Sequence, residues 1–201
     1  CNTSFSNIGL NLNVAGMQKT ARGLLFNTKL PSLFPYSKSK FQLDKEDASS
    51  EVMMTAIGQG ETLVSPYHMV LIASAIGNGG ILMEPYLVDR IESHTGASVE
   101  KNMPKKYTEL MTSQGASVLK DYMIKVVENG TASALKSEKY IVAGKTGTAE
   151  YSSDKEKAHS WFMGFTNPDN PDLAISIVVE NADNSGMSAV SVAKKILNAY
   201  Y

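Results

Sequence analysis

The sequence predicts an α/β domain in which helices pack on an antiparallel sheet. Segments with apolar residues at helical spacing cover residues 3–26, 65–80 and 113–129 and the stretch from Ser188 onward. Three strand-like segments follow one another between residues 140 and 181, and short turns link them. Strands joined by short turns are expected to be antiparallel neighbours. The chain of 201 residues can therefore form one domain with a core, or part of a larger one.

The first third of the chain predicts a helical segment followed by a loop. Residues 3–26 carry four large apolar residues among small and polar ones, namely Phe5, Ile8, Leu12 and Val14. Residues 27–59 contain two prolines and a run of charges, which predicts a loop with one short helix before Gly58.

A buried helix is predicted next. Ser65 can cap it with a side-chain oxygen, and Pro66 suits its first position. Apolar residues surround nearly its whole circumference until Gly79 and Gly80 end it, which is typical of a helix inside the core. Residues 86–101 then predict a hairpin around Thr95 and Gly96.

The rest of the chain predicts a helix, three strands and a closing helix. In residues 113–129 one apolar face is expected from Val118, Leu119, Tyr122, Met123, Val126 and Val127. Strands are expected at residues 140–150, 159–166 and 173–181, the third being apolar enough to be covered on both faces. The last helix has its expected apolar stripe at Ala189, Ala193, Ile196, Leu197 and Tyr200.

Composition excludes several classes of protein. A formal net charge of −1 without a basic stripe argues against a nucleic-acid partner. No apolar run is long enough to cross a bilayer. The single cysteine excludes an internal disulfide and a cysteine-based metal site, and His68, His94 and His159 lie too far apart in sequence for a zinc site. Trp161 and the methionines are interpreted as core filling.

The segment Val142–Glu150 carries the chemistry, because it contains Lys145-Thr146-Gly147-Thr148. A lysine beside small hydroxyl residues on an edge strand can hold a carboxylate, and Gly147 lets a ligand approach the backbone. The Thr148 N–H could donate to a developing oxyanion. The tripeptide alone is also compatible with a lysine at a strand edge followed by a turn, because short motifs recur by chance.

Further blocks occur in order along the chain and resemble the transpeptidase domain of penicillin-binding proteins, most closely the high-molecular-weight, membrane-anchored type. Lys-Thr-Gly is a signature shared by these proteins and β-lactamases. The blocks are Gly58–Gly60, Ser65–Gly80, Glu128–Ala132, Lys145–Glu150, Ser160–Phe165 and Val179–Glu180.

The resemblance implies a β-lactamase/transpeptidase-like fold whose N-terminal portion is missing, with residues 1–201 as the C-terminal part of a single transpeptidase domain. It implies that Lys145 is the cationic, proton-transferring group and that Thr146 and Thr148 bind the substrate carboxylate. Gly147 belongs to the same substrate-binding strand. Asn2 would be the asparagine of a Ser-x-Asn motif and would orient the substrate amide.

The partners implied by the resemblance are peptidoglycan stem peptides and β-lactams. Neither a metal nor an organic cofactor is implied. An upstream segment would anchor the parent protein at the outer face of the bacterial cytoplasmic membrane. A β-lactamase or β-lactam sensor domain remains an alternative, although the long 58–80 block favours the transpeptidase. A non-catalytic interaction module is the second alternative.

The family's chemistry also needs a Ser-x-x-Lys pair, in which one helical turn places the amine beside the hydroxyl. The formal matches are Ser37/Lys40, Ser98/Lys101, Ser117/Lys120, Ser133/Lys136, Ser152/Lys155 and Ser191/Lys194. All of them follow Asn2, whereas the family places its nucleophile before Ser-x-Asn. We therefore expect this chain alone not to be acylated, and to expose part of its sheet and core.

Overall fold

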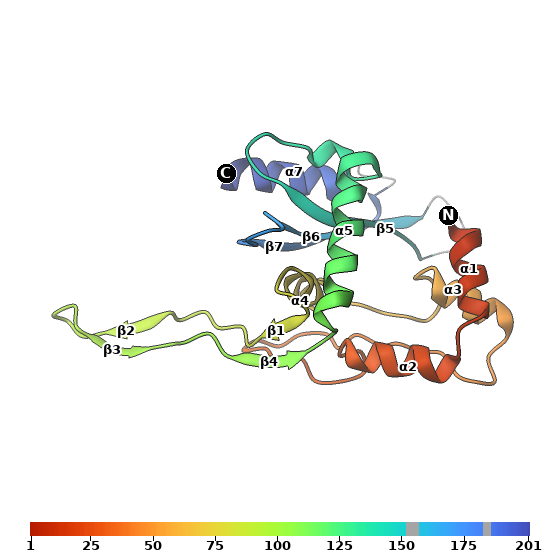
Figure 1. Ribbon diagram of the computed structural model, residues 1–201, viewed down its shortest axis with the longest axis horizontal. Helices are drawn as coiled ribbons and strands as arrows, with labels where there is room; N and C mark the ends of the chain where they lie inside the picture. Colours follow the sequence, from red (N-terminus) through yellow and green to blue (C-terminus); the bar gives the residue numbers. More distant parts are fainter. Residues whose placement is uncertain (152–156, 183–185) are drawn as a thin grey trace.

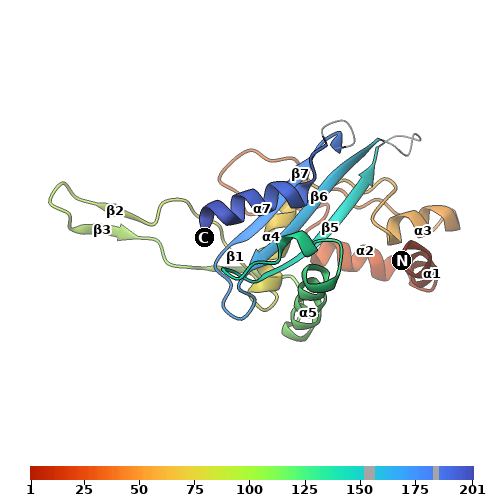
Figure 2. The same ribbon diagram turned by 90° about the horizontal axis from the view of Figure 1, so that it is seen from above.

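The computed structural model describes residues 1–151, 157–182 and 186–201. Its centre is a three-stranded sheet of β5 (Val142–Glu150), β6 (Ala158–Thr166) and β7 (Ala174–Val179). Both pairings are antiparallel, so the predicted arrangement is confirmed. Helix α7 (Ala189–Tyr200) lies on one face of the sheet and α4 (Pro66–Gly77) lies on the other (Figures 1 and 2).

Successive side chains of the strands point to opposite faces of the sheet, so the core has two layers. On the α7 side, Phe162 is fully buried with Leu197 of the helix. On the α4 side, Phe165 and Ala143 pack with Leu71 of that helix. The six residues of β7 are covered from both sides, as predicted, but stay half-buried because β7 is an edge strand of this sheet.

The cap that the sequence predicts for the buried helix is present. The Ser65 hydroxyl accepts a hydrogen bond from the His68 N–H at 3.2 Å, and Pro66 occupies the first turn of α4. The buried residues of α4 confirm its interior position; they are His68, Leu71, Ile72, Ala73, Ala75 and Ile76. Ser188 caps α7 in the same way, with its hydroxyl on the Ser191 N–H.

The N-terminal segment differs from the prediction, because residues 3–26 form two helices. Helix α1 (Asn2–Leu10) ends before Asn13, whose side chain accepts from the Gly16 N–H at 3.2 Å and starts α2 (Val14–Gly23). A good N-cap in the middle of an apolar pattern thus divides it. The short helix expected before Gly58 is present as α3 (Ser49–Ala56).

The predicted apolar face of α5 (Ser113–Asn129) is wrong in part. Ala116, Met123 and Val127 are buried, whereas three of the expected residues are exposed, namely Val118, Leu119 and Tyr122. Ile196 and Tyr200 of α7 are likewise exposed. Each helix contacts the sheet along a stripe narrower than its apolar sequence, so the flanking residues face outward.

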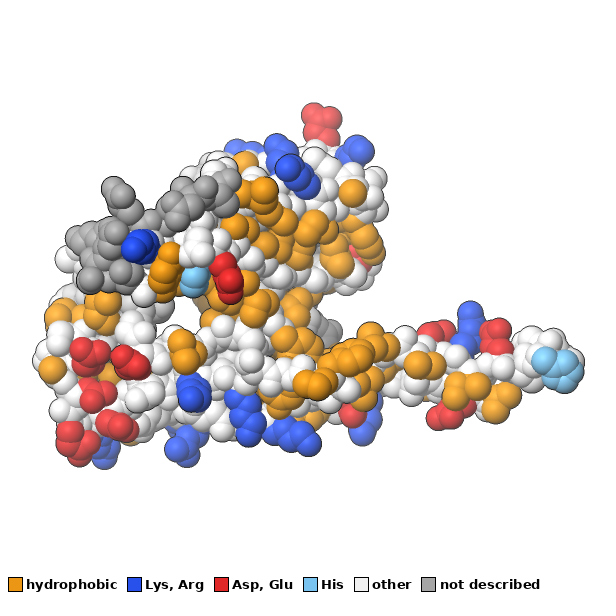
Figure 3. Space-filling view, turned by 180° about the vertical axis from the view of Figure 1, so that it is seen from behind, with side chains coloured by type: hydrophobic (Ala, Val, Ile, Leu, Met, Phe, Trp, Pro, Cys, Tyr) orange, Lys and Arg blue, Asp and Glu red, His pale blue; other side chains and the backbone are white. Residues whose placement is uncertain are grey.

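A long arm leaves the domain between α4 and α5 (Figure 1). Strands β1 (Ile81–Met83) and β4 (Lys106–Glu109) form its root, and β2 (Arg90–Glu92) and β3 (Ser98–Lys101) form the predicted hairpin. Hydrophobic side chains gather along the root (Figure 3). A 3₁₀ turn, η1 (Ser133–Leu135), follows α5. None of the helices in the described part of the chain is long and apolar enough to span a bilayer.

Candidate functional site

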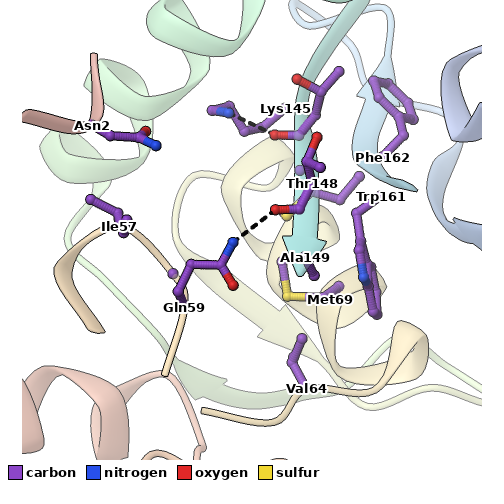
Figure 4. Close-up of a pocket in the computed structure, with 14 residues that line it drawn as sticks. Asn2, Ile57, Gln59, Val64, Met69, Lys145, Thr148, Ala149, Trp161 and Phe162 are labelled. Atoms are coloured by element: carbon purple, nitrogen blue, oxygen red, sulfur yellow. Dashed lines mark hydrogen bonds between the residues drawn. The ribbon is translucent and has the colours of Figure 1, made fainter. Parts of the chain in front are cut away.

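A cavity of about 470 Å³ opens along the free edge of β5. Its lining combines the Lys-Thr-Gly strand with the start of α1, the loop after α3 and parts of α4 and β6 (Figure 4). The lining residues are Asn2, Ile57, Gly58, Gln59, Val64, Met69, Lys145, Thr146, Gly147, Thr148, Ala149, Trp161, Phe162 and Met163. All the site residues singled out from the sequence therefore meet at one cavity.

Strand geometry separates the lysine from the two threonines. Thr146 is paired with the buried Phe162, so it shares the α7 face of the sheet with Thr148, two residues along. Lys145 is paired with Met163, which packs in the α4 layer, and its side chain leaves on that face. The two hydroxyls can therefore approach one ligand group together, while the ammonium reaches the cavity from the other side of the strand.

Among the described residues that line the cavity, Lys145 alone carries a charge. Its Nζ donates to the carbonyl oxygen of Thr146 at 2.6 Å, so the ammonium is turned onto its own strand (Figure 4). The side chain is exposed, and it can turn toward an anionic ligand by exchanging this one hydrogen bond.

Gln59 joins the loop after α3 to the strand. Its Nε2 donates to the Thr148 carbonyl at 3.1 Å (Figure 4). The backbone on both sides of Gln59 is in the left-handed region, with φ of 81° at Gly58 and 78° at Gly60. Because a residue's N–H and C=O leave a strand on the same side, this contact indicates that the Thr148 N–H also faces the free edge. The Gly-Gln-Gly spacing was the only signal in the sequence for this contact.

Gly147 has a structural reason to be glycine. A Cβ at this position would lie 3.1 Å from the Cβ of Trp161, its partner on β6. Trp161 is half-buried and lines the cavity, so its interpretation as core filling is wrong (Figure 4). Its indole continues the α4 face beyond Met163, where the sheet leaves the core and meets the cavity.

Asn2 is the first residue of α1, and its exposed side chain lines the same cavity across from β5 (Figure 4). It reaches the cavity because α1 packs against α3: a Cβ on Gly9 would lie only 2.3 Å from the Ala56 Cβ. The close contact of these helices fixes where the start of α1 projects.

Five of the six Ser-x-x-Lys pairs lie among the described residues, and in none of them does the serine hydroxyl bond its lysine. Lys120 instead donates to the Pro168 carbonyl at 3.1 Å, and the Ser191 hydroxyl bonds the Ser188 carbonyl. The Ser152/Lys155 pair lies outside the described residues.

The three histidines are dispersed. His68 is a core residue as expected, with Nε2 2.7 Å from the Leu24 carbonyl, and burial lowers its pKa. His159 of β6 stacks on Tyr151, which follows the end of β5, and His94 lies at the tip of the arm. Among residues 1–151, 157–182 and 186–201, no group of three His, Cys, Asp or Glu side chains is placed to hold a metal ion.

Comparison with known families gives one clear match. The family model described as "Penicillin binding protein transpeptidase domain" matches residues 1–199. Among curated relatives, the peptidoglycan D,D-transpeptidase MrdA of Acinetobacter baumannii is 25% identical over 98% of this chain. The chain spans 33% of that relative's length.

Solved structures give the same fold. The D,D-transpeptidase domain of a peptidoglycan glycosyltransferase from Eggerthella lenta matches with a TM-score of 0.85 and 26% identity. The match covers 99% of this chain and 50% of that structure. Penicillin-binding protein A of M. tuberculosis, solved as its penicillin G acyl-enzyme, matches with a TM-score of 0.78 and 26% identity over 99% of this chain and 45% of that structure. The chain thus spans about half the length of the solved chains that it matches.

Proposed function

Because the chain belongs to the family of penicillin-binding protein transpeptidase domains, we propose that it forms the Lys-Thr-Gly side of a peptidoglycan D,D-transpeptidase site. The observation that carries this proposal is the meeting of Asn2, Lys145, Thr146 and Thr148 at one cavity on a free strand edge. These residues come from two regions of the chain more than 140 positions apart, so their meeting is a property of the fold.

Each residue takes a role that its position allows. Thr146 and Thr148 donate their hydroxyls to the terminal carboxylate of a stem peptide, since both leave the strand on one face. The Thr148 N–H forms half of an oxyanion hole at the free edge. Lys145 supplies the positive charge and assists proton transfer. Asn2 orients the substrate amide from across the cavity.

The reaction is acyl transfer through a serine. The serine oxygen attacks the carbonyl between the two D-alanines, the C–N bond breaks, and the released D-alanine takes the proton that the serine gave up. An amine of a neighbouring stem peptide then displaces the serine. β-Lactams acylate the same serine, and the resulting ester is hydrolysed slowly. The proposed enzyme works at the outer face of the cytoplasmic membrane, anchored by an upstream segment.

We place the nucleophile outside residues 1–201. Two observations support this: the Ser-x-x-Lys pairs of the described residues are not joined by hydrogen bonds, and the chain spans only about half of the solved relatives. A second cavity, of about 750 Å³, is lined largely by apolar residues, many of them from α1 and α2, and supports the presence of a further packed element there.

Intact mass after incubation with penicillin G tests the proposal on this chain and on a longer chain that extends upstream. We expect no adduct on residues 1–201 and one adduct per molecule on the longer chain. A stoichiometric adduct on this chain would place the nucleophile within it and contradict the proposal. Steady turnover of the penicillin by the longer chain would favour a β-lactamase instead.

A further inference from the structure

The Glu128–Ala132 segment, which joins α5 to η1, has no role in the site described above. A side-chain hydrogen bond joins it to the Lys-Thr-Gly strand: the Oγ1 of Thr131 lies 2.5 Å from the Oγ1 of Thr146. Thr146 lines the cavity, whereas Thr131 is not among the lining residues. Either hydroxyl could be the donor in the unliganded molecule.

We propose that Thr131 is a positioning residue that fixes the direction of the Thr146 hydroxyl. Thr131 donates its proton to Thr146, and Thr146 is then free to donate its own proton to the carboxylate in the cavity. This inference rests on the proposed function, because it assumes a carboxylate ligand at the Lys-Thr-Gly strand.

The backbone around Thr131 is held firmly. The N–H groups of Gly130 and Ala132 both donate to the Val126 carbonyl, at 3.1 and 3.2 Å. A Cβ on Gly130 would lie 2.8 Å from that same oxygen, so only glycine fits. Ala132 is fully buried in the α7 layer. The end of α5 therefore places the Thr131 side chain beside β5 independently of any ligand.

Hydrogen-bond counting then sets the direction. A threonine hydroxyl has one proton and two lone pairs. If Thr146 gave its proton to Thr131, it could offer an anion only lone pairs, which repel it. With the opposite direction, Thr146 accepts one neutral bond and donates one charge-assisted bond, and the two bonds polarise each other. An anion in the cavity therefore selects the chain from Thr131 to Thr146 to carboxylate.

The direction of the Thr131–Thr146 hydrogen bond matters because of the other groups that line the cavity. Lys145 supplies the charge in the described lining, and it projects on the opposite face of the strand from Thr146. On the Thr146 face, β5 offers the carboxylate the hydroxyls of Thr146 and Thr148. A Thr146 hydroxyl that points the wrong way therefore removes one of two direct hydrogen bonds, which the charge of Lys145 on the other face does not replace.

Acylation rates of the longer chain test the inference with two ligands, penicillin G and its methyl ester. Thr131→Val keeps the shape and removes the hydroxyl, whereas Thr131→Ser keeps the hydroxyl. Thr95→Val at the tip of the arm is the matched control. Since a neutral hydrogen bond contributes about 0.5–1.5 kcal/mol, we expect the valine variant to lose roughly 2- to 10-fold in acylation by the free acid.

The methyl ester distinguishes a positioning role of Thr131 from a general structural effect of its substitution. Thr131→Val should leave the already slow acylation by the ester unchanged, and Thr131→Ser should restore most of the rate with the free acid. An equal loss with both ligands, or no loss with either, would overturn the inference while the proposed function stands. An unsubstituted longer chain that takes up no penicillin would overturn the proposed function and this inference with it.

Discussion

Two regions of this chain are packed very differently. The sheet region comprises α4, α5, α7 and the strands β5 to β7, and the N-terminal region comprises α1, α2, α3 and the loops that join them to one another and to α4. Helix α4 buries six of its residues, whereas α1, α2 and α3 each bury one, namely Gly9, Ala21 and Val52. Large apolar side chains of α1 such as Phe5 and Ile8 are more than half exposed beside the second cavity. The sheet region is thus the more closely packed of the two, and the N-terminal helices carry large apolar side chains that the described residues leave exposed.

The candidate site lies where these two regions meet. Lys145 and the two threonines come from the sheet, and Asn2 and Gln59 come from the N-terminal region. The residues on β5 are supported by the buried core on both faces of the sheet, whereas those on α1 and the loop after α3 belong to elements with few buried residues. Substitutions in the two regions should therefore have unequal consequences for stability.

The largest effect is expected from Phe162→Ala. Phe162 packs between β6 and α7 and is 0% exposed to solvent. Its truncation therefore leaves a cavity that close-packed neighbours cannot fill. We expect a loss of about 3–5 kcal/mol in the free energy of unfolding, measured by urea denaturation of this chain. A loss below about 1 kcal/mol would mean that the sheet region is as loosely packed as the N-terminal region.

Gly9→Ala tests the close contact of α1 with α3 in the N-terminal region. The added Cβ would lie 2.3 Å from that of Ala56, so α1 must move away from α3. We expect a loss of roughly 1–3 kcal/mol, although alanine favours a helix more than glycine does. Hydrogen exchange should rise in α1 and α3 and stay unchanged in β5 and β6.

Gly23→Ala is the matched control for Gly9→Ala. Gly23 ends α2, and a Cβ there would have no atom within 4 Å. The same substitution should therefore be neutral or slightly stabilising. Equal losses in both variants would show that the approach of α1 to α3 is unimportant.

His68 connects the two regions and should make their attachment sensitive to pH. Its ring lies 4.7 Å from that of Phe26, and burial lowers its pKa below the ordinary value of 6.5. As the pH falls below 6.5, the unfolded chain takes up a proton that the folded chain does not. The free energy of unfolding should therefore decrease until the pH passes the lowered pKa of the folded state.

Urea denaturation between pH 7.5 and pH 5 checks this expectation. Carboxylates titrate in the same direction at the acid end, so the test is a difference between variants. His68→Gln should flatten the pH dependence near 6.5, whereas His94→Gln on the exposed arm should leave it as it is. A steeper dependence after His68→Gln would contradict the assignment.

The smallest effect is expected from Phe5→Ala, which removes the same side chain as Phe162→Ala. Phe5 is 58% exposed, so its truncation should change the free energy of unfolding by at most about 0.5 kcal/mol. The substitution should instead reduce self-association of the chain, because the variant has less exposed apolar surface. Analytical ultracentrifugation should show a lower tendency to self-associate, and a large loss of stability instead would mean that the N-terminal region is already closed.

Local signals predicted much of this fold. Ser65, Ser188 and the Gly79–Gly80 pair marked helix ends correctly, because capping depends on the nearest few residues. The three strands of the sheet and their antiparallel order were confirmed for the same reason, since short turns limit the possible pairings. Asn2 and Lys145 were singled out by resemblance, and the structure brings both to one cavity.

What the sequence could not predict depends on distant neighbours. The break before Asn13 was hidden because the apolar pattern continues across it. The outward orientation of Val118 follows from where α5 meets the sheet, which spacing alone cannot decide. The contacts of Gln59 with Thr148 and of Thr131 with Thr146 cross 89 and 15 positions, so no local pattern contains them.

The arm between α4 and α5 is a suitable place to insert a label or tag. Met83 and Lys106 lie opposite each other at its root, and the Leu110 N–H returns to the Gly80 carbonyl at 2.9 Å. Because the chain leaves and re-enters the domain at one place, residues 84–105 can change in length without altering the register of the sheet. A fluorophore or affinity tag inserted at Thr95–Gly96 would therefore sit well away from the cavity and leave the site free for ligand.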